Sequence, residues 1–349
     1  MSLLSVRDLV VRFGTEAEPV YAVNGVDFEL DEGDTLGLVG ESGSGKTVTS
    51  LAIIGLLPRT GARIERGEIV FNDVDLTSLA ESALRRYRGK EIAMVFQDPM
   101  TSLNPVLTIE EQVVETIAAH QRIRSKAARE RALELLELVG IPRPQEQLRR
   151  YPHQFSGGMR QRVMIAIAIA LQPKLLIADE PTTALDVTVQ AQILELMQDL
   201  TAESGTAVIL ISHDLGVVAR TTQRVAVMYA GFVVESAHTP ELFAHPRHPY
   251  TVGLLHSIPR LDTEPDDELT PIEGAPPDQT HEPVGCPFAP RCRWRLEACW
   301  SEMPPLVAVA AAHLLACHNP ATDEEALAGH PLRPGFAAAA EPSALVERV

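Results

Sequence analysis

The chain has 349 residues, of which 45% are hydrophobic, so it can bury a full core and has room for more than one domain. Its formal net charge of -17 argues against a nucleic acid partner, because binding to a phosphate backbone relies on dense Lys and Arg. The N-terminus lacks a basic region followed by an apolar stretch, and no apolar run approaches the ~20 residues that cross a bilayer. We therefore expect a cytoplasmic chain whose membrane role, if any, comes through a partner.

The first part of the chain alternates short apolar runs with longer amphipathic stretches, which predicts an α/β layer structure. A helical block is expected at about 105–155, and with the apolar helix that follows it reaches about 172. Within this block, 126–139 has the apolar spacing of one helical face. The expected strands are Thr35–Val39, Glu68–Phe71, Ile92–Phe96, Leu175–Ala178, Ala207–Ser212 and Arg224–Met228.

The segment from Gly40 to Thr47 fits the pattern G-x-x-x-x-G-K-[ST], between an apolar run and a helical segment at 48–57. In such a loop the backbone amides surround phosphate oxygens, Lys46 reaches the β and γ phosphates, and the Thr47 hydroxyl can ligate Mg²⁺. An ordinary Gly-rich turn is the alternative, but the strand before and the helix after favour a phosphate site. The expected nucleotide-binding residues are Gly40, Ser42, Gly43, Ser44, Gly45, Lys46, Thr47 and Val48.

The run from Leu175 to Glu180 is an apolar strand that ends in two carboxylates. Its end lies at the carboxyl edge of a parallel sheet, where ligands bind. Asp179 would hold Mg²⁺ there, and Glu180 would polarise the attacking water as general base. By itself this pattern is weak, since surface strands also end in acidic residues.

The segment from Phe155 to Gln161 opens a strongly apolar helix, expected at Val163–Leu171, with a bare Ser156-Gly157-Gly158. A helix that starts this way offers a second anion site. An N-cap followed by two flexible glycines is the simpler interpretation. The position of the segment shortly before Asp179 favours the anion site.

Taken in order, these segments resemble the motifs of an ABC ATPase over about residues 1–259. The resemblance implies a P-loop NTPase with a RecA-like core, a β subdomain and a helical subdomain, and with ATP and Mg²⁺ as ligands. The matched segments are Gly40 to Thr47 (Walker A), Gln97 (Q-loop), Ser156 to Gln161 (signature), Leu175 to Glu180 (Walker B), Ala184 to Asp186 (D-loop) and Ser212 to Asp214 (H-loop).

The resemblance also implies roles at these positions. Gln97 would sense the γ phosphate and, with Thr47 and Asp179, lie near Mg²⁺. His213 would contact the γ phosphate, and Asp186 would communicate across a dimer. The remaining residues would contact nucleotide: Ser156, Gly157 and Gly158 would face the ATP of an opposing subunit, and Phe13 resembles the aromatic residue that stacks on adenine, with a core aromatic as the alternative.

Three further stretches resemble the ATPases of oligopeptide and dipeptide importers: Met94 to Pro105, His248 to Pro259 and Gly285 to Cys292. This implies a peripheral protein at the cytoplasmic face of the membrane that powers peptide uptake. Its expected partners are a second, similar ATPase in a heterodimer, two transmembrane permeases and an extracytoplasmic peptide-binding protein. Nickel and sugar importers share the surroundings of Gln97, so these cargoes stay open.

All four cysteines lie in one stretch near the C-terminus, which in a reducing compartment suggests metal ligation before disulfides. Four thiolates suit Zn²⁺ or an iron-sulfur cluster, and the spacing does not choose between them. The resemblance favours a [4Fe-4S] cluster; zinc, with His313 or His318 replacing a cysteine, and unliganded thiols are the alternatives. The cysteines are Cys286, Cys292, Cys299 and Cys317.

The proline-rich and acidic composition after Pro259 predicts a boundary between the cassette at 1–259 and an irregular, Cys-rich extension at 260–320. The stretch 321–349 lacks periodicity and is expected to be a disordered tail.

Two other functions remain possible at this point. A soluble ABC ATPase of DNA repair or translation would have tandem cassettes, coiled coils or a basic surface, and the chain has none of these features. A structural partner with an inactive ATP site is the other. Met159 departs from the Gln of many signature segments, but Glu180 and His213 are both present, so we expect hydrolysis.

Overall fold

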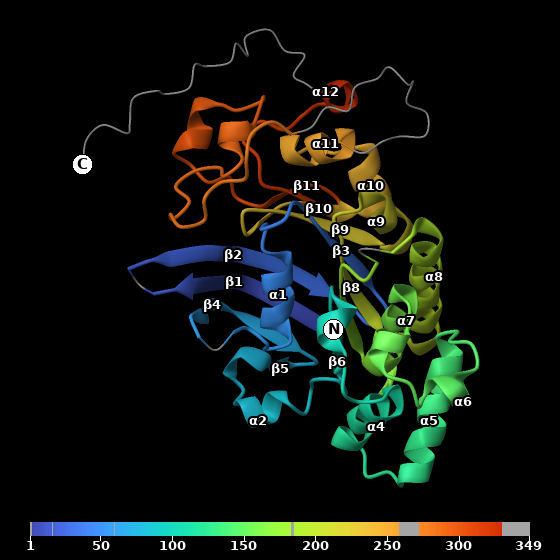
Figure 1. Ribbon diagram of the computed structural model, residues 1–349. Helices are drawn as coiled ribbons and strands as arrows, with labels where there is room; N and C mark the ends of the chain where they lie inside the picture. Colours follow the sequence, from blue (N-terminus) through green and yellow to red (C-terminus); the bar gives the residue numbers. More distant parts are fainter. Residues whose placement is uncertain (1, 16, 59, 183–184, 258–271, 330–349) are drawn as a thin grey trace.

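The computed structural model describes residues 2–15, 17–58, 60–182, 185–257 and 272–329 (Figure 1). An antiparallel sheet near the N-terminus has the strand order β2-β1-β4-β5. Its strands are β1 (Leu4–Gly14), β2 (Pro19–Leu30), β4 (Ala62–Phe71) and β5 (Val74–Asp75).

The larger sheet has the order β11-β12-β10-β9-β3-β8-β7-β6. The run from β9 to β6 is parallel, and β10, β12 and β11 continue it with antiparallel pairs. Five of the six expected strands occur in this sheet with ends shifted by at most one residue, which confirms the α/β fold. The sixth, Glu68–Phe71, is the end of β4 in the antiparallel sheet, and β4 begins six residues earlier, at Ala62. The strands of the larger sheet are β3 (Thr35–Val39), β6 (Ile92–Val95), β7 (Leu175–Asp179), β8 (Ala207–Ile211), β9 (Arg224–Tyr229), β10 (Phe232–His238), β11 (Val307–Ala310) and β12 (His313–Leu315).

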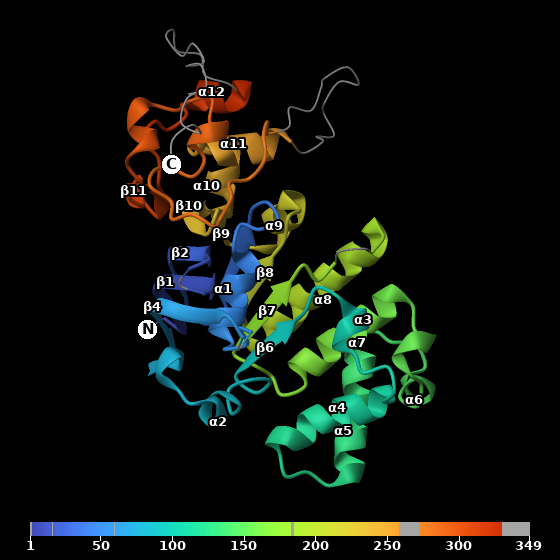
Figure 2. The ribbon, with the colours of Figure 1, turned by 60° about the vertical axis from the view of Figure 1, so that its left-hand side comes forward.

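Twelve α-helices occur in the described part of the chain, with four short 3-10 turns. Helices α4, α5 and α6 lie at one end of the molecule in both Figure 1 and Figure 2, and residues 272–329 lie at the opposite end. The α-helices are α1 (Lys46–Ile53), α2 (Glu81–Leu84), α3 (Pro99–Ser102), α4 (Ile109–His120), α5 (Ser125–Leu138), α6 (Pro144–Gln147), α7 (Gly157–Ile169), α8 (Val187–Ser204), α9 (Leu215–Thr221), α10 (Thr239–Ala244), α11 (Pro249–His256) and α12 (Asp323–Ala328). The 3-10 turns are η1 (Leu76–Ser78), η2 (Pro152–Gln154), η3 (Ala289–Arg291) and η4 (Glu297–Trp300).

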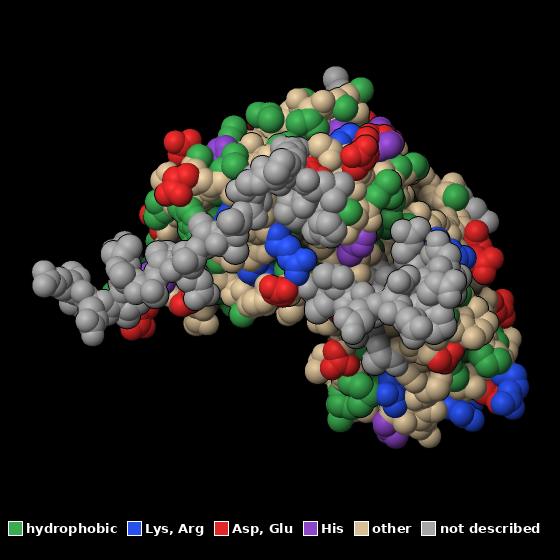
Figure 3. Space-filling model, turned by 90° about the horizontal axis from the view of Figure 1, so that it is seen from above, with side chains coloured by type: hydrophobic (Ala, Val, Ile, Leu, Met, Phe, Trp, Pro, Cys, Tyr) green, Lys and Arg blue, Asp and Glu red, His purple; other side chains and the backbone are tan. Residues whose placement is uncertain are grey.

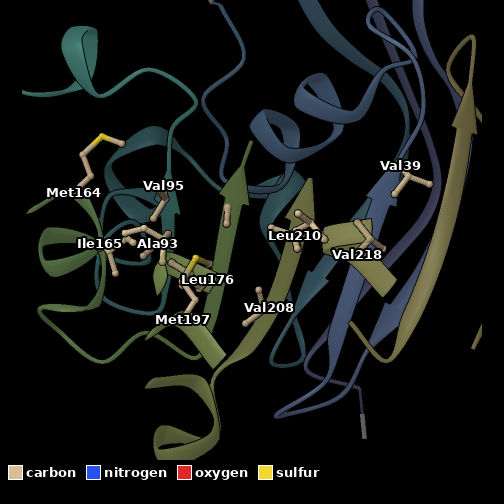
Figure 4. Packing of buried hydrophobic residues seen from close by; sticks show 14 of the residues in the cluster. Val39, Ala93, Val95, Met164, Ile165, Leu176, Met197, Val208, Leu210 and Val218 are labelled. Carbon is tan, nitrogen blue, oxygen red and sulfur yellow. The ribbon is translucent and has the colours of Figure 1, made fainter. Parts of the chain in front are cut away.

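The parallel strands are buried on both faces, which explains why they read as continuous apolar runs. Alternate side chains enter two different clusters: Leu176 and Leu210 pack on one face, Ile177 and Ile209 on the other. Figure 4 shows the first cluster, where Met197 of α8 lies beside Leu176. This packing fixes the strand ends, and with them the loops that carry the polar residues.

The sequence prediction for the C-terminal part needs two corrections. The extension is not wholly irregular, because β12 pairs with β10 and thereby lengthens the cassette's own sheet. The stretch expected to be a tail begins with helix α12, whose first turn is held by a capping box between Thr322 and Glu325. Neither the pairing of β12 nor helix α12 could be predicted from the composition of these stretches, which are rich in Ala and Pro. The expected linker at 260–271 and the rest of the tail, 330–349, lie outside the described residues.

Surface charge is mixed on the face that Figure 3 shows, where acidic, basic and apolar side chains lie interspersed. Among the described residues, none of the helices has both the length and the apolar character needed to cross a membrane.

Candidate nucleotide site

The loop between β3 and α1 depends on glycine at two positions. Gly40 and Gly45 have φ values of 148° and 100°, which favour glycine. A Cβ at Gly40 would lie 2.2 Å from the Met228 carbonyl oxygen, and one at Gly45 would lie 2.6 Å from that of Ala22. The neighbouring backbone therefore leaves no room for a side chain at either position.

Lys46, the first residue of α1, is only 6% exposed and folds back onto this loop. Its Nζ donates to the carbonyl oxygens of Gly40 and Glu41, both at 2.8 Å, and to Ser44 Oγ at 3.2 Å. Burial lowers the pKa of Lys46, while the nearby Glu180, Asp179 and Glu41 carboxylates oppose that shift. A buried ammonium group that rests on this loop, next to the start of a helix, is a donor that a polyphosphate needs.

Thr47 of α1 and Asp179 at the end of β7 meet at the sheet edge, with Thr47 Oγ1 donating to Asp179 Oδ1 at 3.3 Å. Asp179 is 3% exposed, and this burial raises its pKa, although the Thr47 hydrogen bond acts in the opposite direction. A hydroxyl and a carboxylate oxygen are hard ligands of the kind that Mg²⁺ prefers. The two side chains thus fit the expected metal position.

Glu180 stands between the two other polar residues of the predicted catalytic set. Gln97 Nε2 donates to Glu180 Oε2 at 2.8 Å, and His213 Nδ1 lies 3.3 Å from Glu180 Oε1. These side chains come from the ends of three neighbouring strands, β6, β7 and β8. Glu180 also has a φ of 45°, a conformation that costs on the order of 1–3 kcal/mol in a residue other than glycine. Such strain is often retained where a side chain must point into a site.

The signature segment lies elsewhere on the same chain. Figures 1 and 2 both show the start of α7 away from α1. Ser156 caps α7, its Oγ accepting from the Met159 amide at 3.3 Å, and Gly157 and Gly158 form the first turn. The structure therefore does not bring Ser156, Gly157 and Gly158 to the loop of their own chain.

The other predicted nucleotide contacts lie on other elements. Asp186 caps α8 through the Val189 amide at 3.0 Å, and Ala184 lies outside the described residues. Phe13 lies in β1, where it is half-buried and packs against the hydrophobic cluster that contains Ile177 and Ile209.

Several residues that touch the loop were missed by motif reasoning. The Glu41 amide donates to Tyr250 Oη at 2.8 Å, and Gln279 Nε2 donates to the Gly43 carbonyl at 2.9 Å. Arg291 forms an ion pair with the Glu41 carboxylate. All three lie more than 200 positions away along the chain, where no local motif could have indicated a contact.

The four cysteines are free thiols in one region of the extension. Burial raises the pKa of Cys286 and Cys292 and raises that of Cys317 to about 12, so these thiols stay protonated unless a metal ligates them. No three His, Cys, Asp or Glu side chains of the described residues are arranged as a metal site, so the expected cluster gains no support here. His313 is engaged by Glu235 at 2.9 Å instead of facing a metal.

Comparison with known families gives two matches. The ABC transporter family profile covers residues 23–183, and the profile of the oligopeptide/dipeptide transporter C-terminal region covers residues 234–299. The second match begins in β10, inside the expected cassette.

The chain is similar in sequence to two proteins of Bacillus subtilis that are named as ATP-binding proteins of peptide transport. The chain is 54% identical to the oligopeptide transport ATP-binding protein OppD over 89% of its length and 87% of that protein. It is also 54% identical to the dipeptide transport ATP-binding protein DppD, over 85% of its own length and 88% of the relative.

Solved structures share the fold. The dimeric, post-hydrolysis ATP-binding cassette MJ0796 with ADP and Pi has a TM-score of 0.62 at 28% identity, over 68% of this chain and 98% of that one. The cbiO1 protein from Clostridium perfringens, part of the ABC transporter complex cbiONQ, has a TM-score of 0.59 at 26% identity, over 70% of this chain and 91% of that one.

Proposed function

The chain belongs to the oligopeptide/dipeptide ABC transporter ATP-binding proteins, and on that premise we propose that it hydrolyses ATP to power peptide uptake through partner permeases. The observation that carries this proposal is the position of Glu180. It lies between Gln97 and His213 and follows Asp179, which bonds Thr47 of the phosphate loop.

In the proposed reaction Glu180 is the general base that polarises the water attacking the γ phosphate. Gln97 and His213, which contact its two carboxylate oxygens, would turn to that water and to the γ phosphate. Lys46 would exchange its carbonyl partners for β and γ phosphate oxygens. Thr47, Asp179 and Gln97 would hold Mg²⁺, which would supply positive charge beside the phosphates.

The proposed site is shared between two ATPases. Ser156, Gly157 and Gly158 lie away from the loop of their own chain, so their exposed helix start is free to face ATP on an opposing subunit. Asp186 would lie at the same junction. The proposed complex at the cytoplasmic face contains a second ATPase, forming a heterodimer, two permeases and an extracytoplasmic peptide-binding protein.

The Glu180→Gln variant tests the catalytic assignment. It keeps the shape of the side chain but removes the base, so phosphate release by the assembled transporter should fall at least ~100-fold while ATP still binds. Glu137→Gln makes the same change on the exposed surface of α5 and should leave turnover unaltered. Equal turnover in the Glu180→Gln variant and wild type would contradict the role of Glu180.

Cargo is tested by uptake. Reconstituted transporter with its binding protein should accumulate a labelled peptide only when ATP is supplied. Accumulation of Ni²⁺ or of a sugar in place of the peptide would support the alternative importers instead.

For the extension we propose that the four thiolates hold a [4Fe-4S] cluster. The support is the family resemblance, together with two backbone amides that donate to cysteine sulfur atoms. The Leu296 amide donates to Cys299 Sγ and the Asn319 amide to Cys317 Sγ, both at 3.4 Å. Protein purified without oxygen should contain about four iron and four acid-labile sulfide per chain. Zinc alone, or no metal, would exclude the cluster.

A further inference from the structure

An ion pair joins the extension to the phosphate loop. Arg291 Nη1 lies 2.6 Å from Glu41 Oε2, and Arg291 Nη2 lies 3.0 Å from Glu41 Oε1, which makes a bidentate contact. Glu41 directly follows Gly40, and Arg291 stands directly before Cys292. The pair therefore links the cysteine-rich segment to the loop across 250 positions of sequence.

Every N–H group of the Arg291 side chain donates a hydrogen bond within the protein. Its side chain is 5% exposed, and its remaining donors reach the carbonyl oxygens of Glu273 (2.9 Å) and Ile272 (3.2 Å) and the hydroxyl of Tyr229 (3.2 Å). With the two bonds to Glu41, all five N–H donors of the guanidinium are used. A lysine could supply the charge but not this planar arrangement of donors.

Glu41 in turn contacts Lys46, the residue that would bind the β and γ phosphates. Its carbonyl oxygen accepts from Lys46 Nζ at 2.8 Å, and its amide donates to Tyr250 Oη at 2.8 Å. The side chain, the amide and the carbonyl of one loop residue are thus each fixed by a different partner. A shift of the Glu41 side chain would move the backbone on which Lys46 rests.

A second contact fixes the same loop from the extension. Gln279 donates to the Gly43 carbonyl at 2.9 Å, and its own carbonyl accepts from the Tyr21 amide of β2 at 2.8 Å. A cavity of about 230 Å³ lies where these segments meet; Glu41 to Ser44, Tyr229, Ala230 and Pro276 to Gln279 line it. Tyr229, which lines this cavity, packs edge-on against Phe288, with ring centres 5.2 Å apart.

We propose that the C-terminal extension contributes to the ATP site. Arg291 is the positioning residue: through Glu41 it holds the phosphate loop in the conformation that binds ATP. This inference rests on the ATPase activity proposed above. Arg291 touches neither Glu180 nor the strand ends that carry Gln97 and His213. Losing it should therefore weaken ATP binding more than it slows the chemical step.

The test compares Arg291→Met with Arg293→Met. Both remove one positive charge from the same segment, but the partner of Arg293 among the described residues is the largely exposed Glu273, at 2.7 Å. For Arg291→Met the Kd of the full-length chain for ATP, and the KM of the assembled transporter, should rise about tenfold with kcat within about twofold. Arg293→Met should match wild type, and Arg291→Lys should recover part of the affinity.

Glu41→Gln breaks the same pair from the loop and covers the case that Arg291→Met does not fold. The Glu41→Gln, Arg291→Met double variant should bind ATP no more weakly than the weaker single variant, because both changes remove one interaction.

Three results separate the possible failures. If wild type itself does not bind ATP, the proposed function fails. If wild type binds ATP and Arg291→Met binds it equally well, the positioning role is wrong. If Arg291→Met lowers kcat and the melting temperature with KM unchanged, Arg291 is merely structural and the inference is overturned.

Discussion

Asp179 is 3% exposed, and its carboxylate accepts a hydrogen bond from the neutral hydroxyl group of Thr47. Its environment suits a bound cation better than it suits the free protein, because burial raises the pKa of this group and so disfavours the charged form that a metal needs. The buried charge of Asp179 therefore lowers the stability of the nucleotide-free protein, whereas the same charge favours metal binding.

Replacing Asp179 by Asn should raise the melting temperature of the nucleotide-free protein at pH 7, because it removes a buried charge. A raised folded-state pKa means that the cost is absent below the unfolded pKa, appears as pH rises, and is complete above the folded pKa. The gain should therefore shrink as the solution is acidified. Calorimetry across pH checks this, and a lower melting temperature at pH 7 would contradict it.

The same variant should lose the stabilisation that Mg²⁺ and ATP give to wild type, which is about 2.7 kcal/mol at a hundredfold excess over Kd. The two opposite effects distinguish a ligand-binding carboxylate from a structural one.

Among the elements, α7 has two roles at its first turn. Ser156 caps the helix within its own chain, and the same Ser-Gly-Gly start is proposed to face ATP on another subunit. A capped helix start keeps amides aligned, so one arrangement can serve both purposes.

Ser156→Ala should lower the free energy of unfolding by about 1 kcal/mol, the usual loss for an N-cap, yet reduce ATP hydrolysis by the assembled transporter far more. Thr108→Ala is the matched control: Thr108 caps α4 by the same kind of bond, to the Glu111 amide, also at 3.3 Å. Urea denaturation and phosphate release measure the two effects. Equal activity in the two variants would argue against a shared ATP site.

At the scale of the whole molecule, the extension and the cassette are joined by a buried pair. Glu235 of β10 is fully buried, and His313 of β12 lies 2.9 Å from it with 2% of its side chain exposed. Glu235 also accepts from the amides of Arg247 and His248, at 2.7 and 3.0 Å. The carboxylate thus organises three segments around the added strand.

His313→Ala should cost about 3–5 kcal/mol of unfolding free energy, because it leaves a buried carboxylate without its side-chain partner. His245→Ala removes the exposed pair with Asp323, at 3.1 Å, and should cost less than about 1 kcal/mol. Denaturation of both variants measures the difference. Similar small losses would mean that the two amides suffice for Glu235.

The sequence by itself determined the features that contiguous residues encode. The phosphate loop, the strand ending in Asp179 and Glu180, and the helix start at Ser156 all depend on backbone geometry over a few positions, so their residue types predict them. The α/β fold followed from the alternation of short apolar runs with amphipathic stretches. The family followed from the resemblance of these segments, in their order, to the motifs of ABC ATPases.

Only the tertiary structure decided which distant segments meet. Three such contacts are the pairing of β12 with β10, the ion pair of Arg291 with Glu41 and the hydrogen bond from Gln279 to Gly43. They join residues whose neighbours in the sequence give no indication of a partner. Strand register and side-chain packing determine such contacts, and neither can be predicted from a short stretch of sequence. The phosphate loop was therefore predictable from eight residues, whereas the extension that supports it became visible only in the folded chain.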